Sequence, residues 1–276
     1  MMKLRKFWES NLSLILLLWI IIALIIRPGW IYFLAVFFLW IVLAFLSAPG
    51  VFWNYVAIFH PNPASSQRLL ERAVSFNPLV FYPYLALGLS YAKRQEWPKA
   101  IPMFEIAVEH SPQRKKNQNS LWLAEAYRAG GRNEQALSIL EMLLQNGSNS
   151  MKINQNLSLV LFQLNRLPEA LEYAKKARTF NLSATEPVLI QAKIYFAMGD
   201  YQQAKNDYQW VIEHLKYPVE SLYWLGRSEL ELGETDAAVG HLQLAVERIT
   251  ADPLLADVSI DEAEEWLSRA LKRKQS

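Results

Sequence analysis

The sequence predicts an all-α protein, in which an N-terminal transmembrane helical hairpin precedes a right-handed α-solenoid of repeated helix pairs and a C-terminal capping helix. Three observations support this prediction: two long apolar segments at the N-terminus, a 34-residue period in small residues, and an amphipathic C-terminal segment. The expected domains are a membrane anchor at 1–60, a partial first repeat at 61–80, five repeats at 81–252 and the capping helix at 253–276.

Charged residues are unevenly distributed along the chain. Residues 61–276 hold 24 of the 28 Lys and Arg residues and 25 of the 26 Asp and Glu residues, so the formal net charge of +2 comes from the N-terminal end. Because nucleic-acid-binding proteins cluster Lys and Arg on one face, we expect no nucleic-acid partner. Cysteine is absent, which excludes disulfides, thiolate metal ligands and cysteine nucleophiles.

The two N-terminal apolar segments have the composition of membrane helices. The first, residues 12–26, contains Ser13 as its one polar residue, and the second, residues 30–46, has no polar group except the Tyr32 hydroxyl. Because a helix needs about 20 residues to span a bilayer, we expect transmembrane helices at about 8–26 and 30–48. The lipid bilayer would then be a partner through residues 8–48.

Neighbouring residues predict the topology of this hairpin. Pro28-Gly29 favours a turn over one continuous helix. Three basic residues precede the first segment and only Arg27 lies in the turn, so the positive-inside rule places the rest of the chain on the cytoplasmic side of the inner membrane. A periplasmic location is the main alternative topology.

A cleaved signal peptide is a competing interpretation of the first segment, because Lys3, Arg5 and Lys6 precede it. It is disfavoured, since no small-x-small cleavage site follows and a second apolar segment comes immediately after. Several aromatic residues follow the second segment, and they fit anchoring at the membrane interface or, alternatively, contact with a partner. These are Phe52, Trp53, Tyr55 and Phe59.

A 34-residue period dominates the rest of the chain. Five alanines keep its phase, with one spacing of 36: Ala100, Ala136, Ala170, Ala204 and Ala238. A small residue lies twelve positions before each of them: Gly88, Ala124, Ser158, Ala192 and Gly226. Glycine lies five positions before three of them: Gly131, Gly199 and Gly233. Small residues let two helices approach closely and glycine permits a turn, so the period predicts helix pairs that stack to bury their apolar faces.

The best copy of this unit shows a recognisable pattern. It comprises Tyr84, Leu87, Gly88, Tyr91, Ala100, Phe104, Ala107 and Pro112. This pattern resembles the tetratricopeptide repeat, and its phased copies extend over about residues 64–252. Two departures are that Tyr84 replaces the family's usual tryptophan and that Glu229 stands where the family prefers an aromatic residue. A half-matching unit with Leu70, Ala73 and Pro78 precedes the five copies.

The resemblance implies a concave, protein-binding groove lined by the first helix of each pair. Carried over by phase, the partner-binding residues are Tyr82, Gln118, Trp122, Glu125, Arg128, Lys152, Asn156, Phe162, Lys193, Phe196, Tyr223 and Arg227. Such a mixed surface suits an extended or helical peptide segment. The Lys/Asn set with which the family's best-known version of this groove clamps a C-terminal carboxylate is absent, because Leu85 and Leu89 occupy the corresponding first-repeat positions.

The C-terminal segment has the signature of a capped amphipathic helix. Ser259 to Glu262 form a capping box. Apolar residues then recur on one side of the helix: Ala263, Trp266, Leu267, Ala270 and Leu271. We expect this helix to close the far end of the solenoid.

No motif indicates a catalytic, cofactor-binding or metal site. Phosphate-binding, dinucleotide-binding, zinc-protease and serine-hydrolase signatures do not occur in the sequence. We therefore expect no catalytic residues, metal site, cofactor or small-molecule substrate. The predicted function is a membrane-anchored interaction scaffold or assembly factor. The alternatives are a permanent structural subunit of a larger membrane complex, or an adapter that presents clients to a membrane protease or secretion machine.

Overall fold

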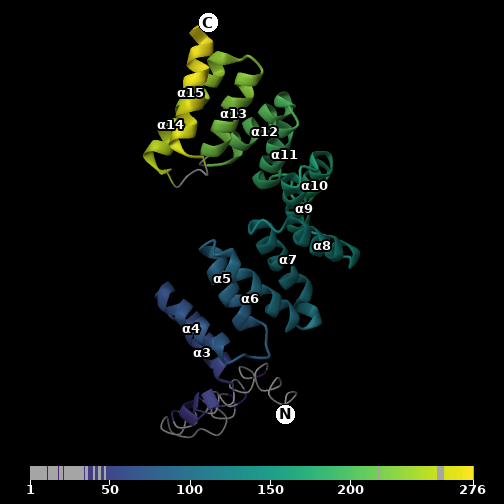
Figure 1. The fold of residues 1–276 in the computed structure, drawn as a ribbon, viewed down its shortest axis with the longest axis vertical. Coiled ribbons are helices and arrows are strands. Elements are labelled where there is room, and N and C mark those ends of the chain that lie inside the picture. Colours follow the sequence, from purple (N-terminus) through teal and green to yellow (C-terminus); the bar gives the residue numbers. More distant parts are fainter. Residues whose placement is uncertain are drawn as a thin grey trace. The chain divides into compact units, whose positions relative to one another are not determined.

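The structure is a computed structural model that describes residues 48–216, 218–253 and 258–275, together with isolated positions between 11 and 46. In this part of the chain every regular element is a helix (Figure 1). The helices are α3 Pro49–Ile58, α4 Pro63–Ser75, α5 Tyr82–Lys93, α6 Trp97–Glu109, α7 Gln113–Ala129, α8 Asn133–Gln145, α9 Met151–Gln163, α10 Leu167–Phe180, α11 Thr185–Ala197, α12 Tyr201–His214, α13 Val219–Glu231, α14 Thr235–Ala251 and α15 Ile260–Gln275.

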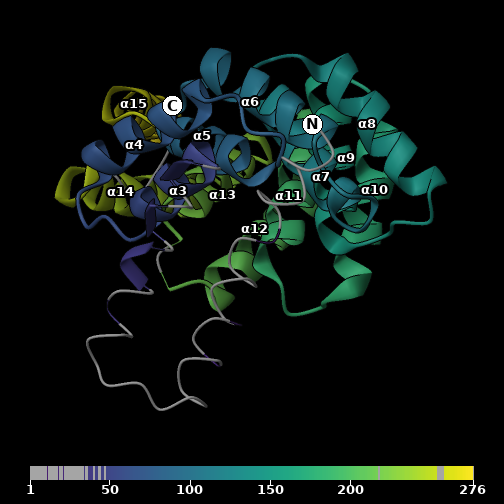
Figure 2. The ribbon, with the colours of Figure 1, turned by 90° about the horizontal axis from the view of Figure 1, so that it is seen from below.

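The helices form two compact units, Met1–Ile139 and Leu140–Ser276, whose boundary lies within α8. In the first unit each helix from α3 to α7 packs on the next, and α3 also contacts α5. In the second unit each helix from α9 to α15 packs on the next, while α9 also contacts α11 and α13 also contacts α15 (Figures 1 and 2). The predicted stacking of helix pairs is therefore present within each unit. The right-handed twist of the whole array stays a prediction.

The small residues of the 34-residue period lie where helices cross. All five phased alanines are completely buried. A Cβ added at Gly88 would lie 2.9 Å from the Phe104 ring, and one added at Gly226 would lie 2.7 Å from Leu242 Cγ. The Ser158 hydroxyl donates a hydrogen bond of 2.8 Å to the carbonyl of Ala170 on the facing helix. These contacts confirm that small side chains permit the close approach of paired helices.

In each of the five repeat copies, the turn between the two helices contains one residue with a left-handed backbone. Gly131, Gly199 and Gly233 have φ angles of 77°, 80° and 80°, as their residue type predicts. In the two copies without glycine, Gln95 and Asn165 take the same position with φ of 59°. The turn geometry therefore recurs in all five copies, although only three of them show it in the sequence.

The predicted inner-membrane location, with two transmembrane helices at 8–26 and 30–48, requires correction. Most of these two ranges lies outside the described residues. Among the residues that the structure does describe, no helix is both long enough and apolar enough to span a bilayer, and this finding contradicts the predicted location. The first helix that the structure describes throughout, α3, has 10 residues, which corresponds to about 15 Å against a hydrocarbon thickness of about 30 Å.

Three of the four aromatic residues that follow the second apolar segment take part in helix packing. The Arg72 guanidinium of α4 lies 4.1 Å from the centre of the Trp53 ring. Phe52 and Tyr55 pack against a buried apolar cluster, whereas Phe59 is 81% exposed. The sequence lacked a signal for this arrangement because α3 follows directly on the apolar segments and shares their composition.

Helix α15 covers the end of the second unit. The Ser259 hydroxyl accepts a hydrogen bond of 3.2 Å from the backbone N–H of Glu262, as the capping box predicts. Ala263 and Ala270 are completely buried in the apolar cluster that α15 shares with α13 and α14. The Arg273 guanidinium donates a hydrogen bond of 2.9 Å to a carbonyl of α13, which ties the helix down at its other end.

Candidate protein-interaction site

Four of the predicted partner-binding residues lie together on α7 in the first unit. Gln118, Trp122, Glu125 and Arg128 fall within about 120° of the helix circumference, given 100° per residue. Gln118 is exposed, and Trp122 keeps 38% of its surface exposed, which is unusual for a side chain of this size. Glu125 and Arg128 are half-buried beside them. We call these four residues the α7 stripe.

Tyr82 lies apart from this stripe at the start of α5. Its ring packs against the buried cluster of Ala48, Val51 and Val80, and it makes an edge contact of 5.8 Å with Phe81. The side chain is half-buried. Tyr82 therefore contributes to the packing of α5 against α3.

Three further predicted residues lie on α9 in the second unit. Lys152 is exposed and Phe162 is half-buried. Asn156 is only 1% exposed, and its side-chain amide donates a hydrogen bond of 3.0 Å to the backbone carbonyl of Lys152. Asn156 therefore belongs to the helix packing and is not accessible to a partner.

Three of the four remaining predicted residues, Phe196, Tyr223 and Arg227, come together around the guanidinium of Arg227. The Arg227 guanidinium lies 5.0 Å from the Phe196 ring and 5.5 Å from the Tyr223 ring. Two tryptophans complete the cluster, with the guanidinium 4.5 Å from Trp224 and 4.1 Å from Trp266. Arg227 also donates a hydrogen bond of 3.3 Å to the Tyr223 hydroxyl. This cation–π cluster joins α11, α13 and α15. The charge of Arg227 therefore stabilises the packing of these helices.

Lys193 is likewise engaged within the fold. Its ammonium lies 2.7 Å from Glu220 on α13, in an ion pair whose side chains are 32% and 23% exposed. Substituting Lys193 or Arg227 would therefore disturb helix packing as well as any surface. Of the predicted set, Gln118 and Trp122 of the α7 stripe and Lys152 of α9 are the most exposed side chains.

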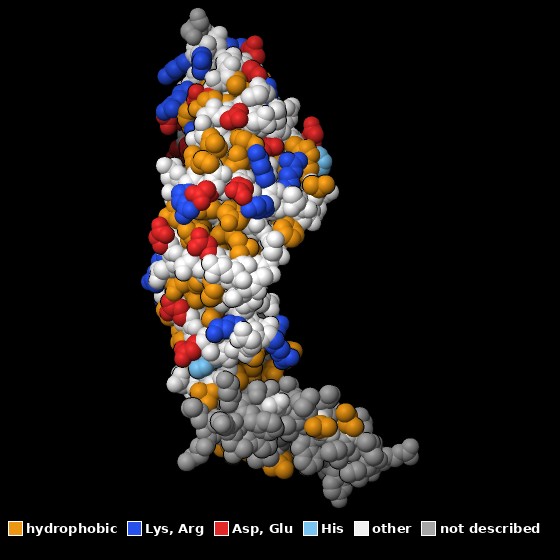
Figure 3. Space-filling model, turned by 90° about the vertical axis from the view of Figure 1, so that its right-hand side faces the viewer, with side chains coloured by type: hydrophobic (Ala, Val, Ile, Leu, Met, Phe, Trp, Pro, Cys, Tyr) orange, Lys and Arg blue, Asp and Glu red, His pale blue; other side chains and the backbone are white. Residues whose placement is uncertain are grey.

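The surface around the helices carries charges of both signs. On the face shown in Figure 3, Lys and Arg side chains lie among Asp and Glu, and hydrophobic side chains are exposed between them. Protein-interaction surfaces combine apolar and polar groups in this way. In the part of the chain that the structure describes, no three His, Asp or Glu side chains are grouped so that they could hold a metal ion.

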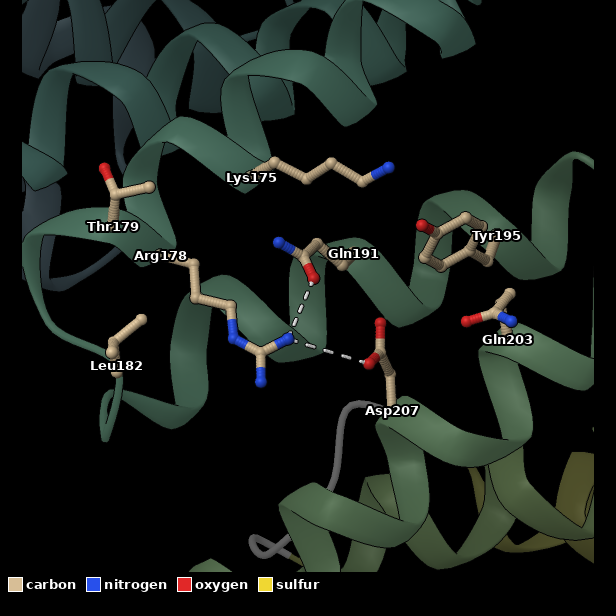
Figure 4. Close-up of a pocket in the computed structure, with 8 residues that line it drawn as sticks. All are labelled: Lys175, Arg178, Thr179, Leu182, Gln191, Tyr195, Gln203 and Asp207. Atoms are coloured by element: carbon tan, nitrogen blue, oxygen red, sulfur yellow. Dashed lines mark hydrogen bonds and ion pairs between the residues drawn. The ribbon is translucent and has the colours of Figure 1, made fainter.

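A pocket in the second unit is lined by residues that the sequence analysis did not single out. Its volume is about 240 Å³ (Figure 4). The lining residues come from α10, the following turn, α11 and α12: Lys175, Arg178, Thr179, Leu182, Gln191, Tyr195, Gln203 and Asp207. The signal that would have identified Arg178 and Gln191 is a position-by-position comparison of the five copies, in which these two polar residues replace aliphatic ones.

Comparison with known proteins agrees with this architecture. The chain is similar to TTC0263, a thermophilic TPR protein of Thermus thermophilus, with 20% identity and a TM-score of 0.56 over 70% of this chain and 100% of that one. It is similar to yeast Tom70, with 13% identity and a TM-score of 0.57 over 84% of this chain and 48% of that one. It is also similar to YrrB, described as a TPR protein with an unusual peptide-binding site, with 18% identity and a TM-score of 0.50 over 75% and 98%.

At these identities the structural likeness establishes the fold alone. Curated protein sequences give no significant match. The family model described as Tetratricopeptide repeat matches residues 85–151, 123–183 and 191–253, which together make up more than half of the chain. The chain therefore belongs to the tetratricopeptide repeat family.

Proposed function

We propose that this protein is an interaction scaffold that binds a peptide or helical segment of a partner protein through the α7 stripe. The observation that carries the proposal is the exposure of Trp122 at 38%, between exposed Gln118 and half-buried Glu125 and Arg128. Tryptophan and arginine dominate the binding energy of protein interfaces, so their presence on one helix face supports a binding role. The peptide-binding description of YrrB supports the same class of function.

The test substitutes Trp122 with alanine and uses Met142→Ala on α8 as the matched control, because Met142 is also a large apolar residue with 41% exposure. We expect Trp122→Ala to reduce co-purification of the partner by roughly tenfold or more, as loss of an interface tryptophan does. Quantitative mass spectrometry of affinity-purified samples measures the effect, and circular dichroism verifies that helicity is retained. Equal recovery with both variants would rule out the α7 stripe.

Stoichiometry distinguishes the scaffold from the two alternative roles. A permanent structural subunit would co-elute with its partners at a fixed ratio and would not exchange with added free protein. An adapter would lose its clients on dilution and rebind them. Size-exclusion chromatography of the purified complex, before and after addition of unlabelled protein, separates these cases.

A further inference from the structure

The pocket of Figure 4 contains polar residues at positions that are apolar elsewhere in the repeat. Gln191 occupies the position that is leucine in all four other copies: Leu87, Leu123, Leu157 and Leu225. Those leucines are buried in the helix-pair core, and Gln191 is equally buried, with 3% of its surface exposed. A buried amide in place of leucine costs free energy unless its hydrogen bonds are satisfied.

Two further positions around Gln191 also hold residue types that the other copies lack. Arg178 occupies a position that is aliphatic in the other copies: Val108, Leu144, Ile212 and Val246. Asp207 occupies a position that elsewhere holds no acidic residue: Met103, Ile139, Tyr173 and His241. Two neighbouring copies thus contribute these polar residues, Arg178 from one and Gln191 and Asp207 from the next, and Arg178 contacts the other two (Figure 4). Local violations of a fold's own pattern concentrate at functional sites.

Two polar atoms of this pocket form no hydrogen bond within the described part of the chain. Arg178 donates a hydrogen bond of 3.5 Å to the side-chain oxygen of Gln191 and lies 4.0 Å from one carboxylate oxygen of Asp207. Among the described residues, neither Gln191 Nε2 nor Asp207 Oδ2 has a hydrogen-bond partner, although both atoms are buried. The pocket therefore offers one donor and one acceptor, which is the complement of a single peptide group.

The charge on one wall of the pocket is reversed relative to the preceding copies. In two of those copies a tyrosine hydroxyl donates to a glutamate of the preceding helix, from Tyr91 to Glu71 at 3.0 Å and from Tyr127 to Glu105 at 2.6 Å. Tyr195 occupies the same position in the pocket.

At the position of those glutamates the pocket instead has Lys175, whose ammonium lies 5.6 Å from the centre of the Tyr195 ring. The carboxylate that the fold supplies in the earlier copies is thus replaced by a cation, and Arg178 adds a second positive charge.

We propose that this pocket binds an acidic residue of a partner polypeptide. The ligand carboxylate would lie beside Lys175, Arg178 and the Tyr195 hydroxyl, in the place that a glutamate of the chain occupies in the earlier copies. The peptide group of the same residue would accept from Gln191 Nε2 and donate to Asp207 Oδ2. The volume of about 240 Å³ is below the range of about 300–1,000 Å³ typical of drug-sized ligands, which suits a single residue.

The proposed site is separate from the groove that the family resemblance implies. On α11 the pocket residues Gln191 and Tyr195 are centred about 150° around the helix from Lys193 and Phe196, given 100° per residue. It is also separate from the α7 stripe, which belongs to the other unit. Loss of binding at one site therefore leaves the other testable.

The test uses N-acetyl-glutamate N-methylamide as the probe and ¹H–¹⁵N NMR of the full chain as the readout. We expect saturable shifts of the Gln191 side-chain amide and of the Thr179 and Gln203 backbone amides. N-acetyl-glutamine N-methylamide, a neutral analogue of the same shape, should bind about tenfold more weakly, because it lacks the charge-assisted hydrogen bonds. Succinate should also bind more weakly, since it has no peptide group.

Matched variants assign the binding to the pocket. Lys175→Met should weaken binding of the glutamate probe by about threefold. Lys176→Met should leave it unchanged, because the neighbouring Lys176 instead pairs with Glu172 at 2.6 Å. Gln191→Leu restores the residue of the other copies, so it should abolish binding while raising the Tm.

The proposal is overturned by any of three results. These are no saturable shift with the glutamate probe, equal affinity for the glutamate and glutamine probes, or equal loss in Lys175→Met and Lys176→Met. Succinate binding as tightly as the glutamate probe would overturn the peptide assignment and identify a small carboxylate as the ligand. Partner capture through Trp122 does not depend on these outcomes, so failure here leaves the proposed scaffold function intact.

Discussion

At the scale of single residues, Asp207 shows the cost of a polar residue inside a repeat. Burial raises the pKa of its carboxyl to about 6, against the opposing effect of Arg178 and Lys175 on α10. The folded state then binds the proton more tightly than the unfolded chain does. The resulting stabilisation is complete below the ordinary pKa of aspartate and is lost as the pH rises through about 6.

Asp207→Asn should therefore increase the free energy of unfolding at pH 7, by roughly 1–3 kcal/mol, and change it much less at pH 4. Urea unfolding of both proteins at the two pH values measures this difference. An effect of the same size at both pH values would show that ionisation of Asp207 is not its cause.

Glu229 illustrates how a departure from the family pattern is compensated. The fifth copy has this glutamate where three of the other copies have tyrosine. The Glu229 side chain is 4% exposed, and its carboxylate lies 2.8 Å from Nδ1 of His241. This hydrogen bond raises the pKa of His241. Glu229 and His241 are therefore paired in space. The sequence did not reveal this pairing, because the two residues lie twelve positions apart.

At the scale of helices, close packing depends on particular glycines. Gly226 and Gly240 are both helical, but only Gly226 faces another helix, where an added Cβ would lie 2.7 Å from Leu242 Cγ and 3.2 Å from the Ala238 carbonyl. Among the described residues, no atom lies within 4 Å of a Cβ added at Gly240. Two identical substitutions should therefore have opposite effects.

Gly226→Ala should destabilise the protein by about 1–3 kcal/mol, because overpacking forces α13 and α14 apart. Gly240→Ala should stabilise it by about 0.5–1 kcal/mol through helix propensity. Thermal unfolding followed by circular dichroism measures both. Stabilisation by Gly226→Ala would mean that the pair has room to shift and that the small residue is not required there.

At the scale of the whole molecule, an array of helix pairs needs a covered end. Helix α15 buries Ala263 and Ala270 and packs Trp266 and Leu267 against α13 and α14. A chain ending at Asp252 should therefore unfold its second unit at a lower temperature, with a loss of about 3 kcal/mol or more.

Limited proteolysis and thermal unfolding report this loss. Leu271→Ser is the control, since Leu271 is 41% exposed and exposed substitutions change stability by only about 0.5 kcal/mol. Equal stability of the truncated and full chains would show that α15 is not the cap.

Repeat phase and residue size were enough to predict the all-α fold, the helix pairs and the capping helix, because close helix crossings and tight turns demand small residues at fixed spacing. Composition also predicted a membrane hairpin, and no described helix supports it. Only packing decided which polar side chains are paired within the fold and which are exposed. Asn156, Lys193 and Arg227 lie at groove positions by phase, yet their partners are provided within the fold.

The pocket depends in the same way on residues from three helices, α10, α11 and α12. A period within one chain reveals which positions face the interior, since that is a property of each helix. It does not reveal which side chains meet there, because those contacts form only when the helices pack.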